Sequence, residues 1–205
     1  MKNLFLVSSF AKLSTELQLF NKELVGKTIT FIPTASKVEK VNFYVKSGKK
    51  ALENMGLIVD LLDVSTAKPE EIKHKLKEND YIYVTGGNSF FLLQELKQSG
   101  ADQMIIEEIQ KGKLYIGESA GAIVLSKTIE YIKKMDSPLK APNLTSFLGL
   151  DVVDFYTVPH YNDSPFSKIT KGIEAQYQEQ LNLCCINNGE GIIVEGTNKR
   201  IIKTN

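Results

Sequence analysis

Short apolar segments alternate with helical segments along this chain, and this alternation constrains the fold more than any other feature of the sequence. Strands are expected at residues 3–7, 28–32, 57–62, 81–85, 114–116, 152–158, 183–186, 192–194 and 200–203. Helices are expected at residues 37–55, 69–78, 89–98, 101–111, 120–126 and 169–181. The early strands are apolar throughout, which is typical of a parallel sheet covered on both faces. The pattern therefore predicts one doubly wound, mostly parallel α/β domain over residues 1–205, with helices on both faces of the sheet.

Several turns with glycine or polar residues fall where these strands end. In a doubly wound sheet, ligands bind beyond the carboxyl ends of the strands. The Gly86-Gly87 pair, Ser119 and His160 each follow an expected strand, so we expect them to meet at one edge of the sheet. Residues 125–151 form the longest irregular stretch, and they are expected to cover this edge as a loop.

The run Gly117-Glu118-Ser119-Ala120-Gly121 lies between a strand and a helix, which is the sequence pattern of a nucleophile elbow. Its glycines leave room for the unusual backbone conformation that exposes such a serine. The Ala120 N–H can then face an oxyanion that forms on a bound carbonyl. A tight turn with a capping serine would give the same pattern, and a partner base distinguishes the two.

The chain contains two histidines. His74 lies in a charged helical segment whose apolar stripe is Ile72 and Leu76, so it is expected to face solvent. His160 follows Pro159 at the end of an expected strand, where loops carry function. If Ser119 is a nucleophile, His160 is therefore the candidate base.

An acidic residue is expected to orient the histidine and to stabilise its charged form. Glu190 lies between two glycines in a turn at a strand end, although an ordinary hairpin turn residue would give the same pattern. Asp136, which precedes Ser137-Pro138, is the alternative acid, and a loop aspartate that starts a turn fits there too. Glu190 is favoured because a strand end is stiffer than a long loop.

A second glycine turn, Gly86-Gly87-Asn88-Ser89, joins an expected strand to an expected helix, with Ser89 as a candidate cap. Two glycines allow a backbone N–H to approach a ligand, so this turn is a candidate for the second oxyanion donor, and Gly86 and Asn88 are expected to contact substrate. An anion site at the helix N-terminus is the rival interpretation. The dinucleotide and nucleoside-triphosphate fingerprints are missing from the sequence, which argues against nucleotide binding.

These motifs, together with Pro159-His160-Tyr161 and Glu190-Gly191, occur in the order seen in the aspartyl dipeptidase (peptidase E) family of serine peptidases, which the chain resembles from about residue 29 to residue 190. The resemblance implies a fold similar to the class I glutamine amidotransferase domains. It implies Ser119 as nucleophile, His160 as base and Glu190 as acid, and Asp136 matches another acidic position considered for that role. By the same resemblance, Gly87 and Ala120 would supply the oxyanion hole.

One segment departs from that family. Its aspartate-specific members carry an arginine-bearing segment after the histidine, which holds the acidic side chain of the substrate. Residues 167–176 here contain lysines and no arginine, and Arg200 is the one arginine of the chain. Lysine does not reproduce the two parallel hydrogen bonds that arginine makes to a carboxylate. The resemblance therefore predicts the hydrolase machinery without strict aspartyl specificity.

The composition is that of an ordinary globular protein, with 42% apolar and 24% charged residues. A net charge of +1 indicates neither a nucleic-acid partner nor a membrane partner. The apolar run at residues 4–7 is too short for a signal-peptide core. Cys184 and Cys185 are adjacent in an apolar strand, as expected for reduced cysteines of a cytoplasmic protein. With one candidate histidine and no ligand spacing, neither a metal nor a cofactor is expected.

These features predict a cytoplasmic serine hydrolase, most simply a peptidase that cleaves short peptides through an acyl-enzyme. Two alternatives stay open at this point. An esterase or acyltransferase would use the same triad, and a non-catalytic domain would bind a small ligand on the same fold. A glutamine amidotransferase is not favoured, because that class uses a cysteine nucleophile where this chain has Ser119.

Overall fold

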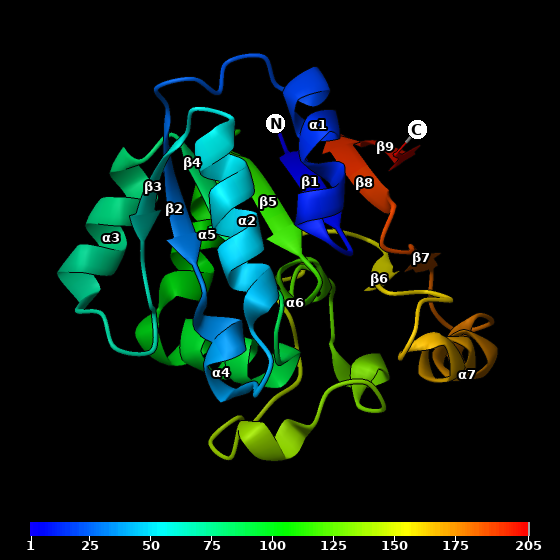
Figure 1. Cartoon of the computed structure of the whole chain (residues 1–205). Helices are drawn as coiled ribbons and strands as arrows, with labels where there is room; N and C mark the ends of the chain where they lie inside the picture. Colours follow the sequence, from blue (N-terminus) through cyan, green and yellow to red (C-terminus); the bar gives the residue numbers. More distant parts are fainter. Residues whose placement is uncertain (205) are drawn as a thin grey trace.

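A seven-stranded sheet forms the centre of the molecule, for which the computed structural model describes residues 1–204 (Figure 1). Its strands are β1 (Asn3–Val7), β2 (Thr28–Ile32), β3 (Ile58–Leu61), β4 (Tyr81–Val84), β5 (Leu114–Glu118), β8 (Glu190–Glu195) and β9 (Asn198–Lys203). Their order is β3-β2-β4-β5-β1-β8-β9. The first five strands in this order are parallel, and β8 and β9 form an antiparallel hairpin beside β1.

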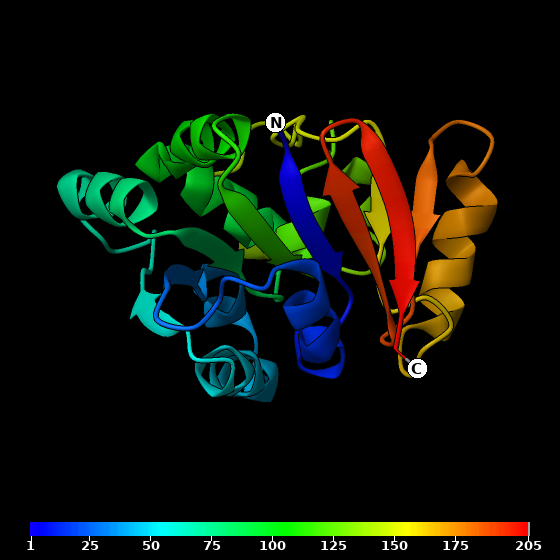
Figure 2. The ribbon, with the colours of Figure 1, turned by 90° about the horizontal axis from the view of Figure 1, so that it is seen from above.

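Helices cover both faces of this sheet, as Figure 2 shows. One face packs against α1 (Phe10–Phe20) and α2 (Phe43–Asn54), and the other packs against α3 (Pro69–Glu78), α4 (Ser89–Ser99) and α5 (Ala101–Gln110). Successive side chains of a strand point to opposite faces, so in β1 Phe5 and Val7 join the first group of helices while Leu4 and Leu6 join the second. This arrangement confirms the predicted doubly wound, mostly parallel α/β fold.

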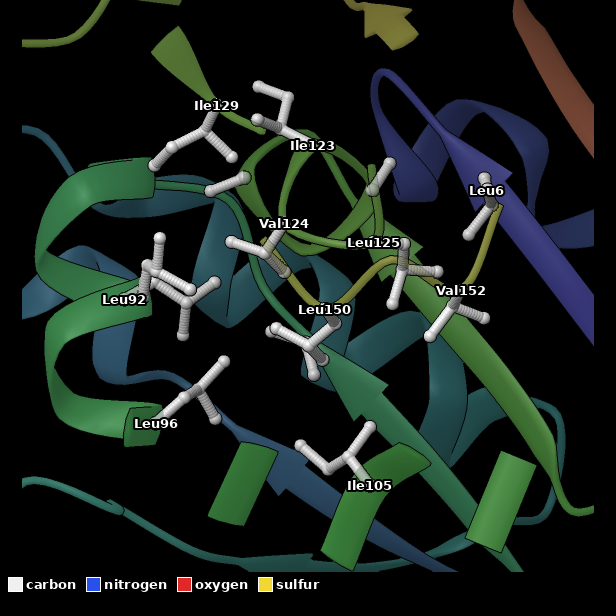
Figure 3. Close-up of a cluster of buried hydrophobic side chains, with 14 of the residues drawn as sticks. Leu6, Leu92, Leu96, Ile105, Ile123, Val124, Leu125, Ile129, Leu150 and Val152 are labelled. Atoms are coloured by element: carbon white, nitrogen blue, oxygen red, sulfur yellow. The ribbon is translucent and has the colours of Figure 1, made fainter. Parts of the chain in front are cut away.

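The core beside α4 and α5 also anchors the long irregular segment (Figure 3). Val124 and Leu125, which follow the short helix α6 (Ala120–Ile123), cluster with Leu150 and Val152. The Leu150 N–H donates to the Val124 carbonyl and the Val152 N–H to the Leu125 carbonyl, both at 2.8 Å. Between these points the chain forms the 3-10 turns η2 (Glu130–Ile132) and η3 (Pro138–Lys140). Both ends of the irregular segment are therefore fixed to each other in the core.

Some expected elements have other bounds in the structure. The helix expected at residues 37–55 is divided into η1 (Thr34–Val38) and α2, because residues 39–42 leave the helical path and run along the cavity described below. The strand expected at residues 152–158 is reduced to β6 (Tyr156–Val158). It pairs in parallel with β7 (Leu183–Cys185) in a separate two-stranded sheet, and α7 (Ser167–Tyr177) lies between them in sequence.

Helix α1 was not expected from the sequence. Its apolar stripe consists of Phe10, Leu13 and Leu17, which are fully buried against the sheet. These residues recur at intervals of three and four, which is the helical period, but the pattern includes only three apolar residues. Among the helices of residues 1–204, none is long and apolar enough to cross a bilayer.

Candidate active site

Ser119 occupies the sharp turn between β5 and α6. Its backbone has φ 47° and ψ −103°, a conformation that non-glycine residues rarely adopt and that costs about 1–3 kcal/mol. The flanking glycines make the turn feasible, since a Cβ added to Gly117 would lie 2.7 Å from the Gly121 carbonyl oxygen and one added to Gly121 would lie 2.4 Å from the Val84 carbonyl oxygen. The turn therefore holds the Ser119 hydroxyl beyond the end of β5.

His160 lies beyond the end of β6, directly after Pro159. Its Nε2 atom is 3.1 Å from Ser119 Oγ, and its ring stacks on Phe166 with 5.0 Å between centroids and 26° between planes. The His160 backbone has φ 58°, in the left-handed region. Burial lowers the pKa of His160 below its ordinary value, so the ring is neutral and able to accept a proton at neutral pH.

The other side of the imidazole contacts two residues that sequence reasoning did not identify. His160 Nδ1 lies 2.7 Å from Asn188 Oδ1 and 3.0 Å from Ser8 Oγ. The Asn188 N–H donates to Asp163 Oδ2 at 2.6 Å, which holds the backbone of Asn188 in place. One signal was available for Ser8, because it follows the first expected strand at the same edge of the sheet as Ser119.

Glu190, the acid favoured from the sequence, points elsewhere. It opens β8 opposite Lys203 of β9, and its Oε1 atom lies 2.7 Å from Lys203 Nζ. Its Oε2 atom accepts the Asn187 N–H at 3.1 Å. The expected contact between Glu190 and His160 does not form within residues 1–204, because the hairpin directs the carboxylate toward β9 and presents Asn188 of the preceding turn to the imidazole.

Asp136, the alternative acid, also has other partners. Its Oδ2 atom accepts the Ser89 N–H at 2.8 Å and the Ser89 hydroxyl at 2.6 Å, so it caps the N-terminus of α4. Burial raises the pKa of Asp136 to about 6. Asn88 is the residue before the helix, and its Oδ1 atom accepts the Phe91 N–H at 2.9 Å while its Nδ2 atom donates to the Ser137 carbonyl at 3.1 Å. These bonds fasten the irregular segment to the glycine turn.

Of the two expected oxyanion donors, Ala120 directly follows Ser119, and Gly87 follows Gly86, where an added Cβ would lie 3.3 Å from Ser119 Cβ. Gly87 has φ 136°, and a Cβ at this position would lie 2.2 Å from the Ala35 carbonyl oxygen. The Asn88 N–H donates to that same oxygen at 2.9 Å, which holds the turn against η1. Within the described part of the chain, the N–H groups of Gly87 and Ala120 donate to no protein acceptor, so both are free to bind a ligand oxygen.

Glu118 is a buried carboxylate directly before the nucleophile. It is 3% exposed, its Oε1 atom accepts the Phe10 N–H at 2.9 Å, and its Oε2 atom accepts the Tyr83 hydroxyl at 2.8 Å. Burial raises the pKa of Glu118 despite these donors. Glu118 therefore joins the start of α1 and Tyr83 of β4 to the strand that carries Ser119.

A comparison with protein-family models decides the family. Residues 4–202 match the model of peptidase family S51. The chain belongs to peptidase family S51. An uncharacterized peptidase of Listeria monocytogenes is 56% identical over 196 residues, which is 96% of both proteins. Peptidase E of Haemophilus influenzae is 31% identical over 169 residues, covering 78% of this chain and 74% of that protein.

A solved structure agrees with this assignment. The crystal structure of a candidate peptidase E protein from Listeria monocytogenes EGD-e superposes with a TM-score of 0.97, at 54% identity and with 100% of both chains covered. The protein is therefore a serine-type peptidase of family S51, and its fold is the mostly parallel α/β fold of that neighbour. The resemblance inferred from the motifs is confirmed.

The S51 site opens into a cavity of about 620 Å³. Three segments contribute lining residues beside Ser119 and His160, namely residues 39–44, 135–140 and 164–166. Three carboxylates line the cavity, from Glu39, Glu118 and Asp136. The one lysine that lines it, Lys140, lies 2.7 Å from Glu39 Oε1. The lysine of the wall is therefore paired, and burial raises the pKa of the carboxyl groups of Glu118 and Asp136.

The positions considered for holding an acidic substrate lie outside this cavity. Lys168 and Lys171 are exposed on α7, and Arg200 lies on β9 with its Nη2 atom 3.9 Å from Glu195 Oε2. None of the three is among the residues that line the cavity. In the described residues 1–204, no three histidine, cysteine, aspartate or glutamate side chains come together as a metal site requires.

Proposed function

We propose that this S51 peptidase hydrolyses short peptides with Ser119 as nucleophile and His160 as general base. The observation that carries the proposal is the 3.1 Å contact between Ser119 Oγ and His160 Nε2 at the wall of the cavity. A serine within hydrogen-bonding distance of a neutral imidazole is the arrangement that activates a hydroxyl for attack. The cavity volume suits a ligand of small-molecule or short-peptide size.

The proposed reaction has two halves. His160 Nε2 takes the hydroxyl proton as Ser119 Oγ attacks the scissile carbonyl carbon, and the N–H groups of Gly87 and Ala120 bind the oxyanion. Collapse of this intermediate breaks the peptide C–N bond, and His160 returns the proton to the leaving amine. A water molecule that His160 deprotonates then hydrolyses the Ser119 ester and releases the acid product.

In this proposal Asn188 orients His160, in the place where the sequence predicted Glu190 or Asp136. The 2.7 Å contact between Asn188 Oδ1 and His160 Nδ1 supports it. An amide oxygen accepts the Nδ1 proton and so directs the Nε2 lone pair to Ser119. It provides less electrostatic stabilisation of the imidazolium than a carboxylate would, and Asp163 contributes at longer range by favouring the protonated ring.

The charges of the cavity support a preference for substrates without an acidic N-terminal side chain. Lys140 is the lysine among the residues that line the cavity, and it is already paired with Glu39. An aspartyl side chain would therefore enter without a free cation to receive it. Neutral and basic N-terminal residues avoid this penalty.

Reaction with a fluorophosphonate probe, read by intact mass, tests the nucleophile. We expect one adduct on the wild type and none on Ser119→Ala, because the hydroxyl oxygen is the attacking atom. Ser126→Ala is the matched control, since Ser126 is also buried, follows α6 closely, and makes no side-chain hydrogen bond through Oγ among the described residues. No adduct on the folded wild type would reject the proposed nucleophile.

A dipeptide panel with varied N-terminal residues then tests the activity. We expect cleavage of neutral and basic N-terminal residues and a kcat/KM about tenfold lower for aspartyl dipeptides, a difference of about 1.4 kcal/mol in transition-state binding. Probe labelling without cleavage of any dipeptide would favour an esterase or acyltransferase. Preferred cleavage of aspartyl dipeptides would reject the proposed specificity.

A further inference from the structure

Ser8 is a buried hydroxyl on the far side of His160 from the nucleophile. It directly follows β1, is 1% exposed, and has three polar neighbours. The His160 backbone N–H donates to Ser8 Oγ at 2.8 Å, Asn188 Oδ1 lies 2.8 Å from Ser8 Oγ, and His160 Nδ1 lies 3.0 Å from it. Ser8 therefore contacts both the base and the residue that orients the base.

The hydrogen-bonding capacity of the hydroxyl indicates the direction of these bonds. Ser8 Oγ accepts the His160 N–H, and it has one proton to donate. Asn188 Oδ1 is the nearer of the two remaining neighbours, so the hydroxyl donates to the amide oxygen. The amide oxygen then receives two donors, the Ser8 O–H and the His160 Nδ1–H.

We propose that Ser8 is a positioning residue that sets the tautomer of His160 by fixing the amide of Asn188. The proposal rests on the proposed function of Asn188. An amide has two different ends, and in the reversed orientation Asn188 Nδ2 would donate to His160 Nδ1. The proton would then reside on Nε2, which would donate to Ser119 instead of accepting its proton. The Ser8 hydroxyl favours the productive orientation because only the amide oxygen accepts its proton.

A carboxylate at position 188 would not need Ser8 to fix its orientation. Both of its oxygens accept, so rotation of the side chain leaves an acceptor facing His160 Nδ1. Ser8 is therefore important specifically because residue 188 is an amide. This dependence separates the proposed role from general support of the fold, since the His160 N–H loses its acceptor in Ser8→Ala whatever stands at position 188.

A double-mutant cycle of Ser8→Ala and Asn188→Asp tests this dependence. In the Asn188 background we expect Ser8→Ala to lower kcat by about tenfold to a hundredfold and to change KM little. This loss is smaller than the roughly 10⁴-fold cost of a wrong tautomer in a Ser-His-Asp triad, because some molecules keep the productive amide orientation. In the Asn188→Asp background we expect a cost several times smaller. Equal costs in both backgrounds would overturn the proposal.

Nitrogen-15 NMR of the imidazole provides a readout that needs no substrate, so it decides the role of Ser8 even if the proposed peptidase activity fails. We expect the Nδ1–H tautomer of His160 in the wild type and a mixture with the Nε2–H tautomer in Ser8→Ala. His74→Gln removes the signal of the other histidine and so assigns the spectrum. Ser8→Cys, which is near in size but a weak donor, carries the same test if the alanine variant does not fold. An unchanged Nδ1–H tautomer in a folded variant would overturn the proposal.

Discussion

At the scale of single residues, the candidate base is held by an amide on the side away from Ser119. Asn188 Oδ1 contacts His160 Nδ1, and the pKa of His160 is lowered chiefly by burial, while the Asn188 hydrogen bond and the charge of Asp163 act in the opposite direction. A general base works in its neutral form, so activity is lost as the pH falls through the pKa of the imidazole. The lowered pKa therefore extends the active range toward acid.

Asn188→Asp is expected to raise the pKa of His160, because a carboxylate beside the ring stabilises the imidazolium. The base then becomes protonated at a higher pH, so the acidic limb of kcat/KM moves upward by about one pH unit or more. pH–rate profiles of the two proteins measure the shift. The exposed His74 provides the control, since His74→Gln leaves the environment of His160 as it is. An unmoved or lowered limb would contradict the proposed place of Asn188 beside the imidazolium.

At the scale of elements, the turns after the parallel strands hold the reacting groups. The β5–α6 turn carries Ser119, and the β4–α4 turn carries Gly87. Each turn is confined by a backbone oxygen of another segment, from Val84 beside Gly121 and from Ala35 beside Gly87. Glycine is required at such points because any Cβ would overlap the neighbouring backbone.

Gly87→Ala is expected to lower kcat by about 10²- to 10³-fold, the usual cost of losing one oxyanion donor, because the new Cβ would displace the turn from Ala35. Steady-state kinetics with a cleaved dipeptide measure the effect. Gly100→Ala is the matched control. Gly100 also has a positive φ, 73°, but a Cβ there would have no atom within 4 Å. The Gly100→Ala substitution should lower the free energy of unfolding by about 1 kcal/mol and leave kcat unchanged. Equal losses of kcat in both variants would implicate backbone strain instead of the oxyanion donor.

At the scale of the whole molecule, the sheet order brings distant parts of the chain to one site. Strand β1 lies between β5 and β8, and Val7 pairs with Glu118 on one side and with Gly191 on the other. The segments that follow β1 and β5 therefore leave the same edge of the sheet, and the turn before β8 lies beside them there (Figure 1). The hairpin of β8 and β9 supports this turn from the outside.

The hairpin makes Glu190 and Asn188 separable by mutation. Glu190→Gln is expected to keep the rate of fluorophosphonate labelling within about twofold, because its partner Lys203 is exposed and such a pair contributes little. Asn188→Ala is expected to slow labelling by at least about tenfold, since the ring loses its orienting acceptor. Greater slowing in Glu190→Gln than in Asn188→Ala would instead assign the orienting role to Glu190, as the sequence predicted.

Much of the fold could be predicted because its signals are local. The expected bounds of β1 and β2 match the structure, since each is a short segment rich in apolar and β-branched residues that is followed by a serine or a proline. Helix α1 was missed because its stripe of three buried residues is short. The strand at β6 was expected to be longer because its apolar residues Val152 and Val153 resemble a strand, although they pack into the core beside the irregular segment.

The sequence by itself determined the α/β alternation, the elbow at Ser119 and the choice of His160 over His74, because each depends on neighbouring residues and on the period of one element. Tertiary structure decided which side chain faces His160 Nδ1. Asn188 and Glu190 are two residues apart in one turn, and only the pairing of β8 with β9 directs Glu190 to Lys203. Ser8 reaches the same imidazole only because β1 lies between β5 and β8. Hydrogen bonds across 152 and 28 residues of chain depend on strand order and register, which no local pattern encodes.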